Sequence, residues 1–411
     1  MVTLVWLIGV TQAQELSGFA ELRGQLSGGL EGVPWQTVEV YRPSFDVEVT
    51  ERVKLHATPQ LSLVQGRYNT EEAYALIEDQ LGPALEAGGC SLEAPPRLGS
   101  ADDAFIVDRL YVDLYGERLD VRVGRQAVNW GSAQFLNPTD LFAEVLLSEP
   151  WRQRQGVDAA RVTVPIGERH QVMGVVGLTK DLQGARAGVK ATANALGTDV
   201  SVLIAALSTD VSEPEATETF VGFDIKGQAV VGFWAEGRTS LSNPALVVST
   251  GVDYSFNVLD RVLVAAQYTY DGTGLEDPAL YSLSARGGGS VLPDCAEDSL
   301  EDEGVTTSAI ARFTIGQHYG LMSVSASAFE DWSASMAGLM NLEDRSTLLI
   351  PSVSWRPGAA WTMNLGAQVP LGEGEFAPGP ALSTLAVGPA ELDLSGLIAD
   401  WTAFAYVRYS L

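Results

Sequence analysis

The chain has 411 residues, of which 46% are hydrophobic, and carries a formal net charge of −27. Its apolar content is too high for a disordered chain, and its acidity argues against a nucleic-acid partner, whose phosphates attract basic surfaces. No stretch approaches the ~18 consecutive apolar residues of a membrane-spanning helix, and the two cysteines are too few for a disulfide framework or a zinc site.

The first element along the chain is the apolar segment MVTLVWLIGVTQA, residues 1–13. It is typical of a secretory signal peptide, with the small residues Thr11 and Ala13 ahead of an expected cut before Gln14. The alternative is a buried first strand. The basic segment that usually opens such a signal is missing, which leaves open a start upstream of Met1. We expect residues 14–411 to form a single domain.

The rest of the chain repeats an alternation of apolar and polar residues, the pattern of strands with one apolar and one wet face. The hairpin between residues 108 and 126 shows it clearly, with a turn at Gly116-Glu117, and so does 321–329, where Met322 and Val324 interleave with serines. The predicted strands number 18 and cover about 16–26, 41–49, 53–63, 108–115, 119–126, 157–164, 170–179, 186–194, 198–207, 218–226, 228–237, 245–256, 260–270, 305–315, 320–330, 346–355, 361–369 and 401–411.

The connections between these strands alternate in length. Short turns are expected at 50–51, 116–117, 165–169, 195–197, 227, 257–259, 316–319 and 356–360, and mostly longer connections lie between them. Outer-membrane barrels show this segregation, with short periplasmic turns and long extracellular loops, and soluble sandwiches do not. We therefore predict an all-β fold, a transmembrane antiparallel β-barrel of 16–18 strands, with 18 favoured.

Charged residues occupy the polar phase of these strands. A soluble core could not bury so many charges, whereas a water-filled lumen solvates them and the apolar phase meets lipid. Arg125 falls on the lipid phase unless Gly124 hosts a bulge. The predicted inward charges are Arg23, Arg42, Lys54, Arg109, Arg122, Arg161, Arg186, Lys190, Arg312, Arg408, Glu21, Asp46, Glu48, Asp113, Asp120, Asp224 and Asp253.

The long connection 129–156 contains an apolar stripe. Asp140 stands as an N-cap ahead of a predicted helix over 141–147, which ends before Pro150. Exposing its apolar side chains to water would cost ~1.5 kcal/mol or more for each large one, so we expect the loop to fold into the barrel and narrow it. The alternative is a loop packed above the rim. The candidate pore-lining and constriction residues are Arg109, Tyr111, Asp113, Asp120, Arg122, Arg125, Asp140, Arg152, Arg154 and Arg161.

Three long connections, 68–103, 208–218 and 271–304, hold 21 acidic and two basic residues, and therefore most of the net charge. One interpretation is a solvated rim. The other is that divalent cations bind there and bridge to anionic head groups of outer-membrane lipid. Cys90 and Cys295 lie in two of these connections, where an oxidising compartment would allow a disulfide across the mouth, and two free thiols are the alternative.

Catalytic chemistry has little support in the sequence. A barrel hydrolase needs a histidine beside a serine or aspartate near the outer mouth. His56 lies on a predicted lumen face without a recognisable partner, and His170 and His318 lie at short turns. Neither a phosphate-binding glycine loop nor a metal-ligand spacing is present. We expect no enzymatic activity, no cofactor and no bound catalytic metal.

Several motifs carry a family resemblance. Gly124-Arg125-Gln126, Trp130-Gly131, Asn137-Pro138-Thr139-Asp140 and the segment 154–158, RQGVD, resemble a segment of porin-like and alginate-export-type outer-membrane β-barrels. The C-terminus, with Ala405, Val407, Tyr409 and Leu411, is similar to a barrel-assembly signal, although such signals usually end in an aromatic residue. The resemblance implies a bacterial outer-membrane location and a lumen that passes solutes. In the export type, arginines serve anionic solutes, but the acidic mouth of this chain argues against a polyanion.

These observations predict a passive porin-like channel for small polar or charged solutes. The alternative is a plugged structural or adhesive barrel with an acidic, cation-binding outer rim. The expected partners are outer-membrane lipid or lipopolysaccharide and small solutes, and the sequence leaves the oligomeric state and the ion selectivity open.

Overall fold

The computed structural model describes residues 14–28, 35–66, 105–134, 136–142, 156–179, 184–208, 217–242, 244–278, 281, 314–377, 384–387, 390–393 and 400–411. The predicted signal segment, the two cysteines, Arg152, Arg154, Arg312 and most of the acidic connections lie outside these residues. No helix within the described part of the chain is long and apolar enough to cross a membrane.

The described residues form one closed antiparallel β-barrel of 18 strands. Its first nine strands are β1 (Gln14–Gly28), β2 (Trp35–Thr50), β3 (Val53–Gly66), β4 (Phe105–Tyr115), β5 (Asp120–Gln126), β6 (Val157–Ile166), β7 (His170–Leu178), β8 (Ala185–Ala195) and β9 (Thr198–Ser208). The others are β10 (Thr217–Gln228), β11 (Gly232–Ser240), β12 (Leu246–Phe256), β13 (Arg261–Asp271), β14 (His318–Ala328), β15 (Trp332–Asn341), β16 (Thr347–Trp355), β17 (Trp361–Leu371) and β20 (Trp401–Ser410). A separate hairpin, β18 (Thr384–Val387) and β19 (Ala390–Asp393), lies between β17 and β20 in the chain.

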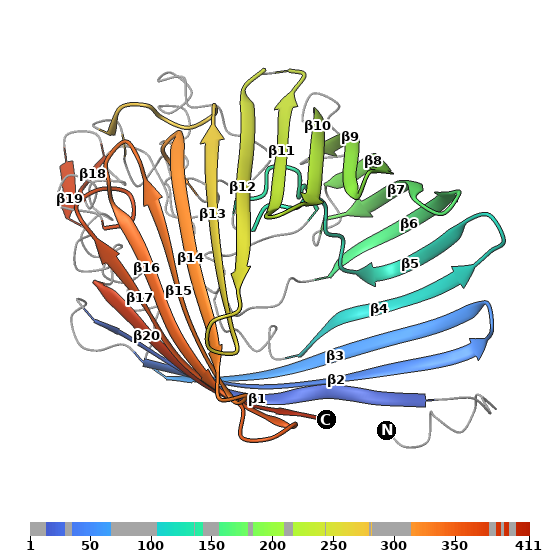
Figure 1. The fold of residues 1–411 in the computed structure, drawn as a ribbon, viewed down its shortest axis with the longest axis horizontal. Helices are drawn as coiled ribbons and strands as arrows, with labels where there is room; N and C mark the ends of the chain where they lie inside the picture. The colour runs from blue at the N-terminus through green and yellow to red at the C-terminus, as the bar shows by residue number, and fades with distance from the viewer. Residues whose placement is uncertain are drawn as a thin grey trace.

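The barrel closes because its last strand joins both its predecessor and its first strand. Each strand from β1 to β17 pairs with the next one, β17 pairs with β20, and β20 pairs with β1, all antiparallel. Tyr409 shows the closure at one residue, because its neighbours are Trp361 on one side and Ala20 on the other. Figure 1 shows the strands curving around a common interior. The prediction of an 18-stranded antiparallel barrel is therefore confirmed.

The alternation of short and long connections also holds. One end of the barrel, the short-turn end, carries tight turns such as Leu196-Gly197 between β8 and β9. Both of these residues have positive φ, 53° and 79°, which matches a two-residue hairpin turn that follows the twist of the strands. The other end, the long-connection end, carries the segments after β3, β5, β13 and β17.

The 18 predicted strands are not the same 18 as those of the barrel. The structure adds β15, and residues 305–313 of the predicted strand 305–315 lie outside the described residues. The described residues 314–317 of the predicted strand 305–315 and of its turn form a bend with one isolated bridge, Leu275 to Gly316. Strand β15 was predicted as a loop. The turn before it uses Phe329 and Glu330 at positive φ, 56° and 60°, without the glycine or asparagine that normally signals such a turn. As a result, His318 opens β14 at the long-connection end, not at a short turn as predicted.

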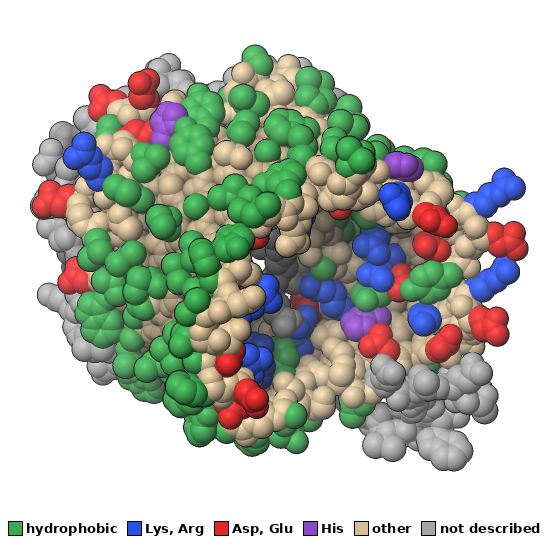
Figure 2. All heavy atoms as spheres, in the orientation of Figure 1, with side chains coloured by type: hydrophobic (Ala, Val, Ile, Leu, Met, Phe, Trp, Pro, Cys, Tyr) green, Lys and Arg blue, Asp and Glu red, His purple; other side chains and the backbone are tan. Residues whose placement is uncertain are grey.

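The two faces of the sheet separate as the alternation predicted. Met322 on β14 is 62% exposed while its neighbour Leu321 is 3% exposed, and on β7 the same contrast holds for Val176 at 60% and Val175 at 1%. The exposed apolar residues therefore form the outside of the barrel, and much of this surface in Figure 2 consists of hydrophobic side chains. The inside contains both packed apolar residues and the charges described below.

Candidate functional site

One side of the barrel interior is basic. Strands β20, β1, β2, β4, β5, β6 and β8 contribute inward cations, and Figure 2 shows Lys and Arg side chains gathered around the hollow. We call this surface the basic wall, and its members are Arg23, Arg42, Arg109, Arg122, Arg161, Arg186, Lys190 and Arg408. All were predicted to point inward from strand phase, because each occupies the polar position of an alternating segment.

Carboxylates on neighbouring strands hold most of these cations in place. Glu21 on β1 receives Arg23 and Arg408, each with a 2.6 Å contact between Nη2 and a carboxylate oxygen. Lys190 Nζ lies 2.8 Å from Asp224 Oδ2. Such pairs compensate the cost of holding charges where water is partly excluded. The paired cations line the lumen but have part of their charge neutralised.

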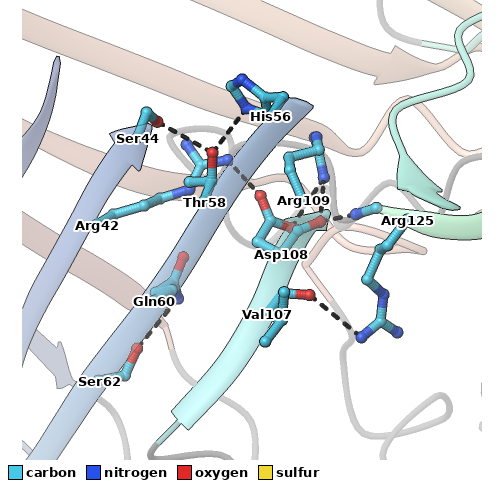
Figure 3. Close-up of polar contacts among 11 residues, drawn as sticks. Arg42, Ser44, His56, Thr58, Gln60, Ser62, Val107, Asp108, Arg109 and Arg125 are labelled. Atoms are coloured by element: carbon cyan, nitrogen blue, oxygen red, sulfur yellow. Dashed lines mark hydrogen bonds and ion pairs between the residues drawn. The ribbon is translucent and has the colours of Figure 1, made fainter. Parts of the chain in front are cut away.

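Asp108 on β4 is the main carboxylate of this surface that the sequence did not reveal. The β3–β4 register shifts between Thr58 and Pro59, and the resulting irregularity turns Asp108 inward beside Arg109. Its carboxylate accepts hydrogen bonds from Arg42, from Arg109 Nη1 at 2.9 Å and from the Gly156 amide at 3.1 Å, as Figure 3 shows for the two arginines. Asp108 therefore fixes two arginines of the basic wall and the start of β6.

Arg161 differs from its neighbours in having no acceptor among the residues that the structure describes. It lies opposite Arg122 in the β5–β6 register. Arg122 binds Asp113 with two contacts, Nε to Oδ1 at 2.6 Å and Nη2 to Oδ2 at 2.9 Å, and its guanidinium sits 4.0 Å from the centre of the Tyr111 ring. Among the described residues, none forms a hydrogen bond or ion pair with the Arg161 side chain. The charge of Arg161 is thus not offset by a contact with any described carboxylate.

His56 does have partners, contrary to the prediction. Its Nδ1 lies 2.7 Å from Asp46 Oδ1 and its Nε2 lies 2.8 Å from Thr58 Oγ1, which in turn contacts Ser44 Oγ at 3.0 Å. The order of groups is that of a nucleophile, a base and an orienting carboxylate. However, Thr58 is only 2% exposed, so its hydroxyl cannot reach a substrate. The chain of hydrogen bonds instead fixes the His56 ring, which stacks on Tyr111 with a centroid distance of 4.8 Å.

A long connection enters the barrel and packs against the inner face of β7, β9 and β10. Its described part, residues 128–134 and 136–142, is called the inner segment here. Trp130, Leu141 and Phe142 are almost fully buried in a cluster with inward side chains of β7, β9 and β10, namely Val175, Leu203, Leu207 and Phe220. Trp130 and Phe142 pack edge to face with centroids 4.7 Å apart. The apolar stripe thus packs inside the barrel, although Leu141 and Phe142 are not helical and residues 143–147 lie outside the described ones.

Polar tethers fasten the inner segment to β10 through β13. Glu236 on β11 is fully buried, and its Oε2 accepts hydrogen bonds from the Ser132 amide at 2.7 Å and from Thr139 Oγ1 at 3.0 Å. Ser132 Oγ also donates to Asp224, which lies closer to the short-turn end of β10 than to its other end. The inner segment therefore reaches past the middle of the strands.

A second segment enters the mouth near β14 to β17. Buried Glu375, in residues 372–377, accepts hydrogen bonds from the Ile315 amide at 2.9 Å, from Tyr319 Oη at 2.5 Å and from Asn341 Nδ2 at 2.8 Å. Asn341 Nδ2 also donates to the Tyr281 hydroxyl, and burial raises the pKa of Tyr281, so this hydroxyl stays protonated. The partners of Glu375 lie 34 to 60 positions away in the sequence. Neither the local sequence nor the strand alternation could have predicted these hydrogen bonds.

The remaining predicted site residues fall in different places. Arg109, Tyr111, Asp113, Arg122 and Arg161 come together on the basic wall, and Asp120 lies nearer the short-turn end. Asp140 lies in the inner segment, where its Oδ1 accepts the Trp130 amide at 3.3 Å. Arg152, Arg154, Cys90 and Cys295 are outside the described residues, so their constriction and disulfide predictions stay predictions.

Arg125 lies on the outer face of the sheet. The β4–β5 register runs through Gly124 without a shift and pairs Arg125 with outward Leu110, although Gly124 has a positive φ of 120°. Its guanidinium donates to the Val107 carbonyl at 3.3 Å and lies 3.6 Å from Asp158. The pore-lining prediction for Arg125 therefore has no support in this geometry.

The fold is that of outer-membrane barrels. OccAB1 of Acinetobacter baumannii aligns with a TM-score of 0.54 at 9% identity, over 98% of this chain and 97% of that chain. OccK5 (OpdH) of Pseudomonas aeruginosa aligns at 0.52 and 8% identity, over 97% and 98%. Wzi, a carbohydrate-binding outer-membrane β-barrel involved in group 1 capsule assembly in Escherichia coli, aligns at 0.51 and 10%, over 96% and 84%.

Sequence comparison is less informative. A family model described as a protein of unknown function (DUF1302) matches residues 78–146, which include β4, β5 and the inner segment. No curated protein matches the chain. At 8–10% identity the structural alignments establish a shared fold and leave solutes and partners to the chemistry of this chain.

Proposed function

We propose that this protein is a porin-like channel of the bacterial outer membrane through which small anionic solutes diffuse passively. The closed barrel with an apolar outside and a charged inside supports a membrane-spanning pore, because lipid requires every backbone polar group to be paired within the barrel. In this setting the short turns face the periplasm and the long connections face outward.

The observation that carries the selectivity is the unpaired Arg161 on the basic wall. An anion that enters the hollow meets a guanidinium that contacts no carboxylate of the described residues, next to Arg122 and at mid-height of β6. Charge in a narrow, partly desolvated passage attracts counter-ions more strongly than charge on an open surface. The acidic connections contribute to the net charge of −27. The charged groups that act on Arg161 are Arg122 and Asp113, and Asp113 is already hydrogen-bonded to Arg122.

The inner segment limits the size of the solute. It occupies the interior beside β7 to β13, so the passage runs between this segment and the basic wall. Arg186 links the two sides, since its Nη1 donates to the Leu141 and Phe142 carbonyls at 3.3 Å. A tethered segment of this kind favours small solutes over a polymer chain. It is also the feature that favours the second candidate, a barrel plugged by its own segments.

A liposome swelling assay with the reconstituted full chain separates the two candidates. If the barrel is an open channel, we expect liposomes to swell with the neutral sugar arabinose and with sodium gluconate, which is of similar size. We expect slower swelling with choline chloride, because its cation enters more slowly. A barrel that inserts, shows heat-modifiable migration and yet gives no swelling with any of these solutes would be a plugged barrel. Such a result would overturn the channel proposal.

A further inference from the structure

The register of β2 to β6 arranges inward side chains in two neighbouring rows that cross these strands. One, called the Arg161 row here, contains Glu48, Lys54, Asp113, Arg122 and Arg161. The other, called the His56 row, lies next to it toward the long-connection end and contains Asp46, His56, Tyr111, Gly124 and Ala159. Residues two apart in a strand share a face and lie about 7 Å apart, so both rows act on the same stretch of the lumen.

The formal charges of the two rows balance while His56 is neutral. The Arg161 row has three basic and two acidic side chains, and the His56 row adds one acid, Asp46. The excess charge of Arg161 is therefore balanced in the next row, although none of the described carboxylates contacts it. A proton on His56 gives the two rows together one net positive charge.

His56 can take up and release this proton without moving its ring. Its side chain is 19% exposed, so water in the lumen reaches it. Nδ1 lies 2.7 Å from Asp46 Oδ1, and Nε2 lies 2.8 Å from Thr58 Oγ1, which contacts Ser44 Oγ at 3.0 Å, as Figure 3 shows for Thr58 and Ser44.

The same hydrogen bonds serve both protonation states of His56. A neutral imidazole donates from Nδ1 to Asp46 and accepts at Nε2 from the Thr58 hydroxyl. A protonated imidazole donates from both nitrogens, and the Thr58 hydroxyl turns to donate to Ser44 Oγ. Protonation therefore changes the charge of the wall without breaking a contact.

A short stack of side chains connects His56 to the Arg161 row. The imidazole stacks on the Tyr111 ring with a centroid distance of 4.8 Å, and the Arg122 guanidinium carbon lies 4.0 Å from the centre of the same ring. The charged and titratable groups next to His56 in the register are Asp46 and Glu48 on β2, Lys54 on β3, and Arg109, Tyr111 and Asp113 on β4. Among these residue types, histidine is the one that changes charge between about pH 5 and pH 8.

We propose that His56 is a second specificity-determining residue of the channel, and that its protonation raises the preference of the passage for anions. This inference rests on the proposed function and adds a residue that controls the attraction exerted by Arg161. The concentration of anions in a narrow passage follows the net charge of its wall, and His56 changes that charge by one.

The test is the permeability ratio of chloride to potassium for the reconstituted full chain at about pH 8 and about pH 5.5. Low ionic strength is needed, because charges are screened beyond about 10 Å in 0.1 M salt. The wild-type ratio is expected to rise roughly two- to fourfold at the lower pH. His56→Gln keeps a polar side chain without the charge and should lose the rise. His56→Lys has a fixed charge and should show the high ratio at both pH values.

His170→Gln is the matched control. His170 opens β7 at the short-turn end, where it is exposed and lies on the outward phase with Val176, so this variant should keep the rise of the wild type. The proposal is overturned by a wild-type ratio that is equal at both pH values, by a rise that persists in His56→Gln, or by a His56→Lys ratio as low at about pH 8 as that of the wild type.

The result can be separated from the channel proposal. A barrel that prefers chloride to the same degree at both pH values contradicts only the role of His56. A folded and inserted barrel that passes no current contradicts the proposed function on which that role rests.

Discussion

At the residue scale, Arg161 is set apart by what its neighbours bind. Arg42, Arg109, Arg122 and Arg408 each contact a carboxylate on the same wall, and Lys190 contacts Asp224 on β10. A paired cation offers a passing anion less attraction, because its partner must be displaced or shared. Without Asp108, Asp113 and Glu21, the same arginines would attract an anion more strongly, but their side chains would be less ordered.

Replacing Arg161 should weaken the selectivity without unfolding the barrel. In Arg161→Ala no carboxylate of the described residues loses a partner, so assembly should be unchanged. The permeability ratio of chloride to potassium should fall about two- to tenfold, the effect of removing roughly 0.4–1.4 kcal/mol of attraction, as measured from reversal potentials. Arg169→Ala, in the short turn before β7, is the matched control and should leave the ratio unchanged. The same ratio in Arg161→Ala as in the wild type would contradict the role given to Arg161.

Side-chain direction was the residue property that the sequence predicted best. The period of two in a strand places alternate residues on opposite faces, and it placed the basic wall correctly. It failed where a local irregularity changed the phase, as at Asp108, and it could not find partners from distant strands, as in Arg42 with Asp108 or Glu375 with Asn341. Those contacts depend on how the barrel closes.

At the element scale, β14 offers a direct check of the two faces. Val324→Arg places a charge on the apolar outside of the barrel, where it costs ~2–4 kcal/mol near the middle of a bilayer. We expect reduced insertion into liposomes and loss of the heat-modifiable band. Ser325→Arg, one residue along on the inward phase, should assemble and change conductance instead. Two variants with the same behaviour would mean that the faces are assigned incorrectly.

The inner segment is the element whose role is most open to experiment. Its tethers to Glu236 and Asp224 hold it below the mouth. Glu236→Ala removes the acceptor of the Ser132 amide and the Thr139 hydroxyl, at about 1–3 kcal/mol for the donors left unpaired. The segment should become more mobile, so single-channel recordings should show a larger mean conductance with more current noise.

Asp253→Ala on β12 is the control for that experiment. It also removes one carboxylate on the inward phase, but the Asp253 side chain forms no hydrogen bond with the described residues of the inner segment. Its current should remain as steady as that of the wild type. An unchanged recording for Glu236→Ala in a folded barrel would place the inner segment outside the rate-limiting passage.

Element boundaries were predictable where turn chemistry was ordinary. The turn at 116–119, with Gly116, and the Leu196-Gly197 turn contain glycine, and the strands beside them agreed with the pattern. The Phe329-Glu330 turn has no such residue, so β15 was predicted as a connection and missed. The apolar stripe of the inner segment predicted burial, but not which strands would provide the wall.

At the scale of the whole molecule, the barrel separates two kinds of surface by a single layer of strands. The outside is apolar, and the inside carries the basic wall and the inner segment. This arrangement explains how a chain with 52 acidic and 25 basic residues can gather cations on the basic wall, because 21 of the acidic residues lie in three connections. Net charge alone therefore did not predict the charge of the passage.

The most direct test of the channel account is the reversal potential of the wild-type barrel in a planar bilayer with a potassium chloride gradient. The account predicts discrete conductance steps and a reversal potential on the side of chloride, because the anion is the more permeant ion beside Arg161. Steps with a reversal potential on the side of potassium, or a folded and inserted barrel that passes no current, would contradict it.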